Sequence, residues 1–179
     1  QRERVEAKGP VDLKAWSADQ LAAEARRAYA EIWTRRQELA ALPVSRLPHF
    51  LDPNTYPEEV RGTLRDAVSY LFVELLADSS LWSPAESNDL FRLDLPALVP
   101  GDPRTSSSVK LDDPTVHPLI ALGAVLDDLE SWHSSTGHRA AALQARIERL
   151  RRLHGAFTGE KQRGRIRADL EQRLLTVRE

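Results

Sequence analysis

The most continuous apolar pattern in the chain covers residues 64–77. Its apolar positions go round the whole circumference of a helix, so the pattern predicts a helix that other elements cover on most sides. Thr63 can cap this helix, and Asp66 lies three residues later, where a carboxylate meets the free amides of the first turn. The stretch is shorter than the roughly 20 apolar residues of a membrane span and contains Glu74. We therefore predict the central helix of a helical core.

Apolar residues at three- and four-residue steps predict further helices on both sides of the central one. Ser17 and Gln20 form an S-x-x-Q capping box in front of a helix expected from Ala18 to about Ala41. Ser83 and Glu86 form a second capping box, which predicts a short helix. Three later helices follow the same spacing, at residues 115–135, 138–153 and 161–177.

The later helices are joined by short glycine-containing turns, which are typical of antiparallel helix hairpins stacked in solenoids. We expect a mostly α fold, an irregular helical array that resembles tetratricopeptide repeats in style, with Pro-rich loops. At most one short strand is expected, where polar and apolar residues alternate at 91–95. Residues 1–16 are expected to be an irregular lead-in and 17–179 a single domain, with a possible division into 17–104 and 113–179.

Helical spacing also predicts which side chains face the core and which face water. In the first helix the expected inward face consists of Leu21, Ala25, Ala28, Ile32 and Leu39, with Tyr29 and Trp33 as a packing ridge. The expected outward arginines of that helix are Arg26, Arg27, Arg35 and Arg36. In the helix at 138–153 they are Arg146, Arg149, Arg151 and Arg152. Phe50 and Leu51, in a Pro-rich stretch, are expected to reach the core, as are Trp82 and Trp132.

Charge divides the 179 residues into three parts. Residues 1–49 hold nine Lys or Arg against seven Asp or Glu, residues 50–136 hold five against fifteen, and residues 137–179 hold eleven against five. Opposed charges of this kind would help the C-terminal part dock on the middle of the chain or on a partner. The basic residues are dispersed along helices without an aromatic platform, which argues against nucleic acid; that class remains a third hypothesis.

Composition excludes several chemistries. The chain has no Cys, so it forms no disulfide, thiolate nucleophile or Cys-ligated metal site. Its eight glycines form neither a G-x-G-x-x-G motif nor a P-loop, and no serine has a nucleophile-elbow context. The sequence begins at Gln1 and contains no Met, so we expect either removal of a signal peptide or excision from a longer protein.

Glu130 and His133 have the E-x-x-H spacing of half a di-iron carboxylate site. Such a site needs a second E-x-x-H motif, and the sequence has none. The remaining histidines show no ligand spacing, and Asp127 and Asp128 are expected on the polar face of their helix. We therefore predict no metal, no cofactor and no enzymatic activity. The alternative is a small helical metal-binding protein or enzyme that uses Glu130, His133 and Asp127.

Several segments resemble one family. Residues 63–71 (TLRDAVSYL) with 77–82 (ADSSLW), and 117–122 (HPLIAL) with 126–132 (LDDLESW), are similar to the helical N-terminal region of large bacterial alpha-2-macroglobulin-like proteins. The similarity covers most of residues 43–179 and rests on packing and capping residues.

This resemblance implies export, a periplasmic or cell-envelope location, and a longer polypeptide of β-sandwich macroglobulin domains that traps proteases. Some family members use an internal thioester between a Cys and a Gln, and this chain has no Cys, so no thioester residue carries over. We expect a non-enzymatic interaction or scaffold module whose partner is another domain of the parent chain or an envelope protein. The expected partner-binding residues are Arg146, Arg149 and Arg152, no membrane span is expected, and a cytoplasmic location stays open.

Overall fold

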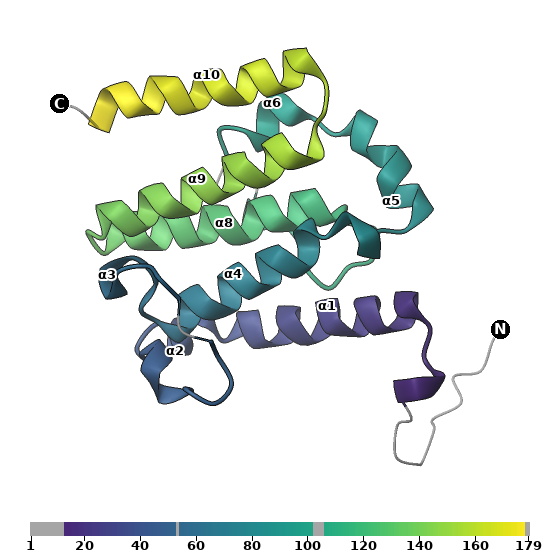
Figure 1. Cartoon of the computed structure of the whole chain (residues 1–179), viewed down its shortest axis with the longest axis horizontal. Coiled ribbons are helices and arrows are strands. Elements are labelled where there is room, and N and C mark those ends of the chain that lie inside the picture. Colours follow the sequence, from purple (N-terminus) through teal and green to yellow (C-terminus); the bar gives the residue numbers. More distant parts are fainter. Residues whose placement is uncertain (1–12, 53, 102–105, 178–179) are drawn as a thin grey trace.

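A computed structural model of the protein describes residues 13–52, 54–101 and 106–177 (Figure 1). Every regular element within these residues is a helix, which confirms the mostly α fold. Residues 91–95, where the sequence allowed at most one short strand, form the end of a 3-10 turn and the start of a short α-helix. Most of the predicted lead-in lies outside the described residues.

Five longer helices make up most of the protein: α1 (Ala18–Thr34), α4 (Leu64–Ala77), α8 (Pro118–Ser135), α9 (Arg139–Ala156) and α10 (Glu160–Val177). Short α-helices connect them: α2 (Arg36–Leu39), α3 (Glu58–Arg61), α5 (Pro84–Asp89) and α6 (Leu95–Leu98). Single turns of 3-10 helix lie at η1 (Leu13–Ala15), η2 (Val44–Arg46), η3 (Ser79–Leu81) and η4 (Leu90–Arg92). None of the helices in these ranges is long and apolar enough to cross a membrane.

Capping residues fix where the helices begin. Ser17 caps α1: its hydroxyl accepts from the Gln20 amide at 3.2 Å, while its own amide donates to Oε1 of Gln20 at 2.8 Å. The predicted box at Ser83 is confirmed for α5, and Thr63 forms a third box with Asp66 at the start of α4. The first helix is shorter than predicted, because it breaks at Arg35 and continues as α2.

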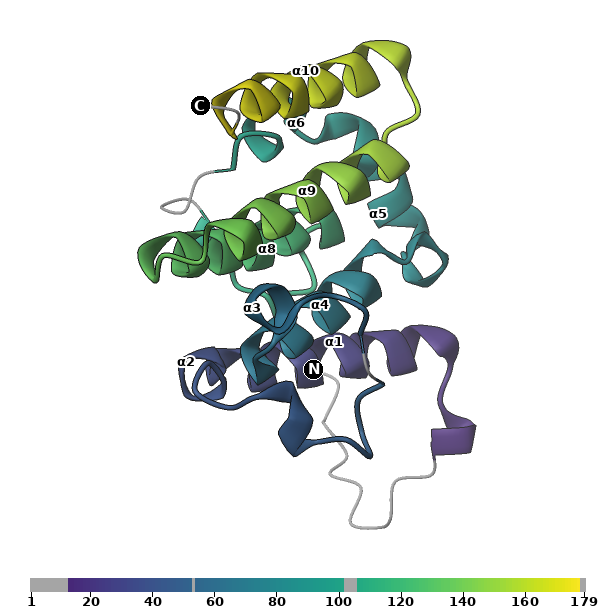
Figure 2. The same ribbon diagram turned by 60° about the vertical axis from the view of Figure 1, so that its left-hand side comes forward.

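The longer helices lie across the molecule in chain order, each against the one before it (Figures 1 and 2). α8 and α9 form an antiparallel hairpin whose turn contains Gly137. This residue has a φ of +83°, a left-handed conformation that glycine adopts without the steric cost of a Cβ. The chain between α4 and α8 is longer and carries α5 and α6, so the array is irregular and not a run of equal hairpins.

The core lies between α4 and α8. Phe72 and Val73 of α4, and Leu122 and Leu126 of α8, are completely buried. Tyr29 of α1 stacks on Phe72 with ring centroids 5.6 Å apart, so the predicted packing ridge is confirmed. The predicted central role of α4 is also confirmed, since α1 and α2 pack on it as well as α8.

Two predictions about exposure are wrong. Phe50 does not reach the core, since 84% of its surface is exposed. On α1, Leu21 and Ile32 face outward, with 42% and 46% of their surfaces exposed. The residues by which α1 packs on the core are Ala30, Tyr29 and Trp33.

Candidate functional site

The three residues of the predicted metal alternative do not face a common site, since two of them contact one arginine and the third contacts an acid on another helix. Asp127 is buried and forms an ion pair with Arg149. Oε2 of Glu130 lies 2.8 Å from Nη2 of the same arginine. His133 points the other way, with its Nε2 2.7 Å from Oδ1 of Asp66 on α4. Among the residues that the structure describes, no three His, Asp or Glu side chains lie where they could hold a metal ion.

The prediction that α9 turns a row of arginines outward is wrong for two of them. Arg146 and Arg149 are buried, with 3% and 1% of their surfaces exposed, and only Arg152 of the proposed set is partly open to solvent. Arg146 binds the Pro100 carbonyl and holds Asp169 of α10 with two hydrogen bonds of 2.9 Å. A prediction from helical spacing places every arginine on the solvent side because the residue is polar. Arg146 and Arg149 instead lie on sides of α9 where acids of α8 and α10 pair with them. Partner binding by Arg146, Arg149 and Arg152 stays a prediction, without an exposed face to support it.

Buried arginines also join the other helices. Arg65 of α4 is 2.7 Å from Asp128 of α8, which Arg36 contacts at 2.9 Å, so Asp128 does not lie on a purely polar face. Burial lowers the pKa of Arg65, and the charge of Asp128 opposes this effect. Arg61 of α3 lies over the rings of Tyr56 and Tyr70, at 3.9 and 3.5 Å. The charged side chains at these junctions are therefore engaged in holding the fold together.

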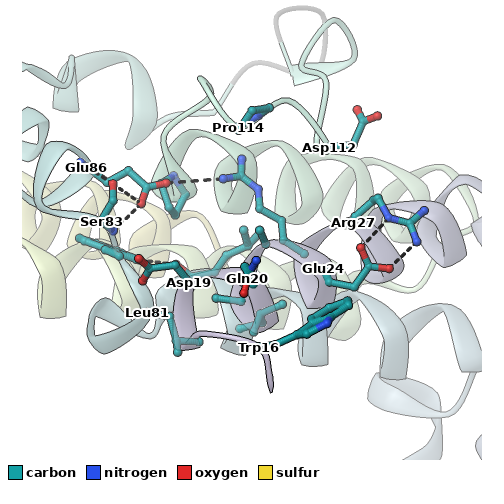
Figure 3. A pocket seen from close by; sticks show the side chains of 17 residues that line it. Trp16, Asp19, Gln20, Glu24, Arg27, Leu81, Ser83, Glu86, Asp112 and Pro114 are labelled. Atoms are coloured by element: carbon teal, nitrogen blue, oxygen red, sulfur yellow. Dashed lines mark hydrogen bonds and ion pairs between the residues drawn. The ribbon is translucent and has the colours of Figure 1, made fainter. Parts of the chain in front are cut away.

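A groove of about 670 Å³ is formed by three segments that are far apart in the sequence (Figure 3). Its lining comes from residues 16–27, from 75–86 at the end of α4 and the start of α5, and from 112–118 before α8. Trp16 and Leu81 lie toward one side in this view, and Pro114 toward the other. A volume of this size falls in the range of ligand sites, roughly 300–1,000 Å³.

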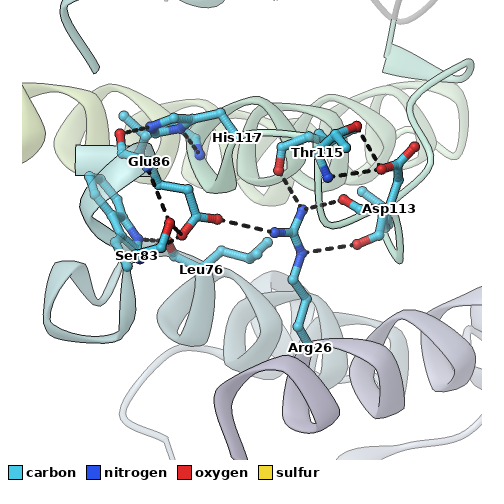
Figure 4. A network of polar contacts seen from close by, with 11 residues as sticks. Arg26, Leu76, Ser83, Glu86, Asp113, Thr115 and His117 are labelled. Carbon is cyan, nitrogen blue, oxygen red and sulfur yellow. Dashed lines mark hydrogen bonds and ion pairs between the residues drawn. The ribbon is translucent and has the colours of Figure 1, made fainter. Parts of the chain in front are cut away.

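Arg26 crosses the groove from α1 and holds the loop before α8 (Figure 4). Its Nε donates to the Leu111 carbonyl at 3.1 Å, and its Nη2 donates to the Val116 and Asp113 carbonyls at 2.7 and 3.3 Å. Nη1 lies 3.7 Å from Oε1 of Glu86. The prediction that Arg26 faces water is wrong. The backbone carbonyls of the turn accept hydrogen bonds from the guanidinium of Arg26.

His117 fixes the adjoining end of α8. Its Nδ1 accepts a 3.1 Å hydrogen bond from the Leu119 amide, so this nitrogen carries no proton, and its Nε2 donates to the Glu86 carbonyl at 2.9 Å. Trp82 packs edge-on against the imidazole, with ring centroids 5.2 Å apart. Burial lowers the pKa of His117, which favours this neutral form.

The groove has an excess of carboxylates over arginines. Four acids and two arginines line it: Asp19, Glu24, Glu86 and Asp112, with Arg26 and Arg27. Glu86 is opposed by Arg26, and Glu24 is hydrogen-bonded to Arg27, which lowers the pKa of the Glu24 carboxyl. Asp19 and Asp112 are the two lining acids that no lining arginine pairs with, so the rim of the groove carries a negative charge.

No protein-family model matches the chain, and no curated protein and no solved structure is significantly similar to it. The resemblance to the helical region of alpha-2-macroglobulin-like proteins therefore stays a prediction.

The groove was missed in the sequence because its parts are separated by up to about a hundred residues. Three of its residues carry a local signal in the sequence: Trp82, which was expected in the core, and Ser83 with Glu86, which form a capping box. Neither signal shows that α1 passes close to them.

Proposed function

We propose that this chain is a non-enzymatic helical interaction module that binds another polypeptide in the groove beside α1. The observation that carries the proposal is the groove itself, a hollow of about 670 Å³ with apolar walls of Trp16, Leu75, Leu81 and Trp82. Aromatic and aliphatic side chains in a concave surface are the usual anchors of a protein interface. The charged clusters elsewhere on α8 and α9 join helices to each other.

We also propose that the module belongs to a larger secreted bacterial protein of the alpha-2-macroglobulin-like class, located in the periplasm or cell envelope. Support for this part is the resemblance at residues 63–71 and 117–122 alone. Protease trapping would then be carried by other domains, and the groove would receive one of those domains or an envelope partner.

No observation favours the alternative of a metal site made from Glu130, His133 and Asp127. Glu130 and Asp127 both form ion pairs with Arg149, and His133 is held by Asp66 on another helix.

Site-specific photo-crosslinking tests the proposal. A photoreactive phenylalanine analogue replaces Ala23, an exposed residue that lines the groove, and in a matched variant replaces Ala168, an exposed residue of α10. In the cells that produce the protein, we expect one adduct of defined mass from position 23 only. Excess wild-type protein should suppress it, and excess Ala23→Trp protein should not. Absence of an adduct, or equal adducts from both positions, would contradict the proposal.

A further inference from the structure

We propose that the occupant of the groove is a short amphipathic helix of a partner protein, with apolar residues on one face and Lys or Arg beside them. This inference rests on the proposed function and specifies the partner. It follows from the shape of the groove, from the hydrogen bonds that the nearby backbone carbonyls already accept, and from the charge of the lining residues.

The shape suits a small number of large apolar side chains. The part of α1 that lines the groove runs from Asp19 to Arg27, which is about 12 Å at 1.5 Å per residue. Ala22 and Ala23 contribute little bulk to this wall, and Leu81 and Trp82 face it from the other side. About two turns of a helix fit along such a length, with two or three side chains inserted.

The backbone around the groove favours a helix over an extended peptide. An extended peptide that binds by strand addition needs the edge of a sheet, and the described residues contain no strand. The loop that carries Asp112 and Pro114 has its carbonyls at Leu111, Asp113 and Val116 already occupied, because they accept hydrogen bonds from Arg26. A helix satisfies its own backbone groups and needs none from the groove.

The charge favours a basic partner. Arg26 opposes Glu86 and Arg27 binds Glu24, so the surplus negative charge lies on Asp19 and Asp112. Neither of these two carboxylates makes a hydrogen bond or an ion pair within the described residues, and both are exposed. Lys or Arg side chains flanking the apolar face of a helix would meet them at the rim of the groove, where charge complementarity selects the partner.

Binding of designed peptides to the complete chain tests the inference. Three fluorescent helical peptides of about 14 residues are compared: one of Leu and Lys, one of Leu and Glu, and one of Ser and Lys. We expect micromolar binding of the Leu and Lys peptide, and at least about tenfold weaker binding of the other two. Equal binding of the Leu and Glu peptide, or of the Ser and Lys peptide, would overturn the inference.

Two pairs of variants locate the binding. Ala23→Trp fills the groove and should weaken binding of the Leu and Lys peptide at least about tenfold, while Ala168→Trp on α10 should not. Asp19→Asn with Asp112→Asn should weaken it about fivefold and flatten its salt dependence. The matched control, Asp52→Asn with Asp94→Asn, removes two exposed charges away from the groove. Equal losses in a variant and its control would overturn the inference.

The outcomes separate the inference from the function on which it rests. Crosslinking at position 23 without binding of the Leu and Lys peptide would overturn the basic helix and leave the interaction module standing. Concentration-dependent dimerisation that Ala23→Trp abolishes would make the occupant a second copy of this chain and would also overturn the inference. Absence of both crosslinking and peptide binding would remove the function and the inference together.

Discussion

Nε2 of His133 lies 2.7 Å from Oδ1 of Asp66, and both side chains are buried. The other carboxylate oxygen, Oδ2, accepts hydrogen bonds from the amide and the hydroxyl of Thr63, at 3.0 and 2.7 Å. One carboxylate therefore caps α4 and holds the last turns of α8 against it. This contact explains why His133 does not face Glu130, its neighbour in the E-x-x-H motif.

Asp66→Ala should lower the free energy of unfolding by about 3 kcal/mol, since it removes a helix cap and leaves the imidazole of His133 buried without a partner. Urea denaturation followed by circular dichroism measures this change. Gln20→Ala is the matched control, because it removes the same position of the capping box from α1 at an exposed site. A loss for Asp66→Ala no larger than that for the control would show that the contact with His133 contributes nothing.

Arg65→Met should destabilise the protein by about 3 kcal/mol. The substitution keeps the apolar length of the side chain but removes a buried guanidinium that binds Asp128 and Oε1 of Gln37 and lies over the ring of Trp132. Arg35→Met, which breaks an exposed pair with Glu38, should change the unfolding midpoint little. If both variants unfolded at the same urea concentration, the buried pair would not hold α4 to α8.

Local signals in the sequence were sufficient to predict most of the helices. Capping boxes such as Ser17 with Gln20 act within one turn, and apolar spacing of the kind found at residues 64–77 acts within one helix. Both are properties of a short stretch of chain, so a sequence shows them directly. The break of α1 at Arg35 depends on how α2 meets α4 and α1, and it was not visible.

The faces of the helices were harder to predict than the helices themselves. A spacing argument places Arg26, Arg146 and Arg149 in water because it scores each residue by its own polarity. In the structure Arg146 and Arg149 are buried and Arg26 is partly buried, because acids or carbonyls of other segments meet them. Partners of this kind lie from 19 to 90 residues away in the chain, so the pattern around each arginine carries no sign of them.

Stability should fall as the pH drops below about 6.5, and His117 should account for part of the loss. Burial lowers the pKa of His117 from its ordinary value of 6.5, against the opposing effects of Glu86 and Asp89. Between the lowered pKa and 6.5 the unfolded chain binds more protons than the folded one, so stability rises with pH in that window and is constant above it. A proton on Nδ1 would also remove the cap on the Leu119 amide.

His117→Asn tests this pH dependence, because asparagine can cap the same amide but does not titrate. We expect a free energy of unfolding that falls less steeply between pH 7.5 and 5 than that of the wild type, as urea denaturation at several pH values would show. The rest of the chain is identical in the two proteins, so the comparison isolates position 117. Parallel curves for the two proteins would assign the acid sensitivity elsewhere.

Addition of zinc, manganese or iron should leave the melting temperature unchanged, and EDTA should have no effect. The reason is geometric: Glu130 and Asp127 form ion pairs with Arg149, and His133 is turned toward Asp66. Calorimetry of protein purified without chelator, with metal analysis of the same sample, makes the measurement. Stoichiometric metal would revive the alternative that the E-x-x-H motif suggested.

Arg26→Met should loosen the loop before α8 and lower the free energy of unfolding by about 2 kcal/mol, because three carbonyls lose their donor. Hydrogen exchange followed by mass spectrometry should show faster exchange at residues 111–116 than in the wild type. Arg27→Met, on the neighbouring exposed position of α1, should leave those amides unchanged. Arg26→Met should also weaken peptide binding, because the loop supplies Asp112 and Pro114 to the groove. Unchanged exchange at residues 111–116 would show that Arg26 does not hold this loop in place beside the groove.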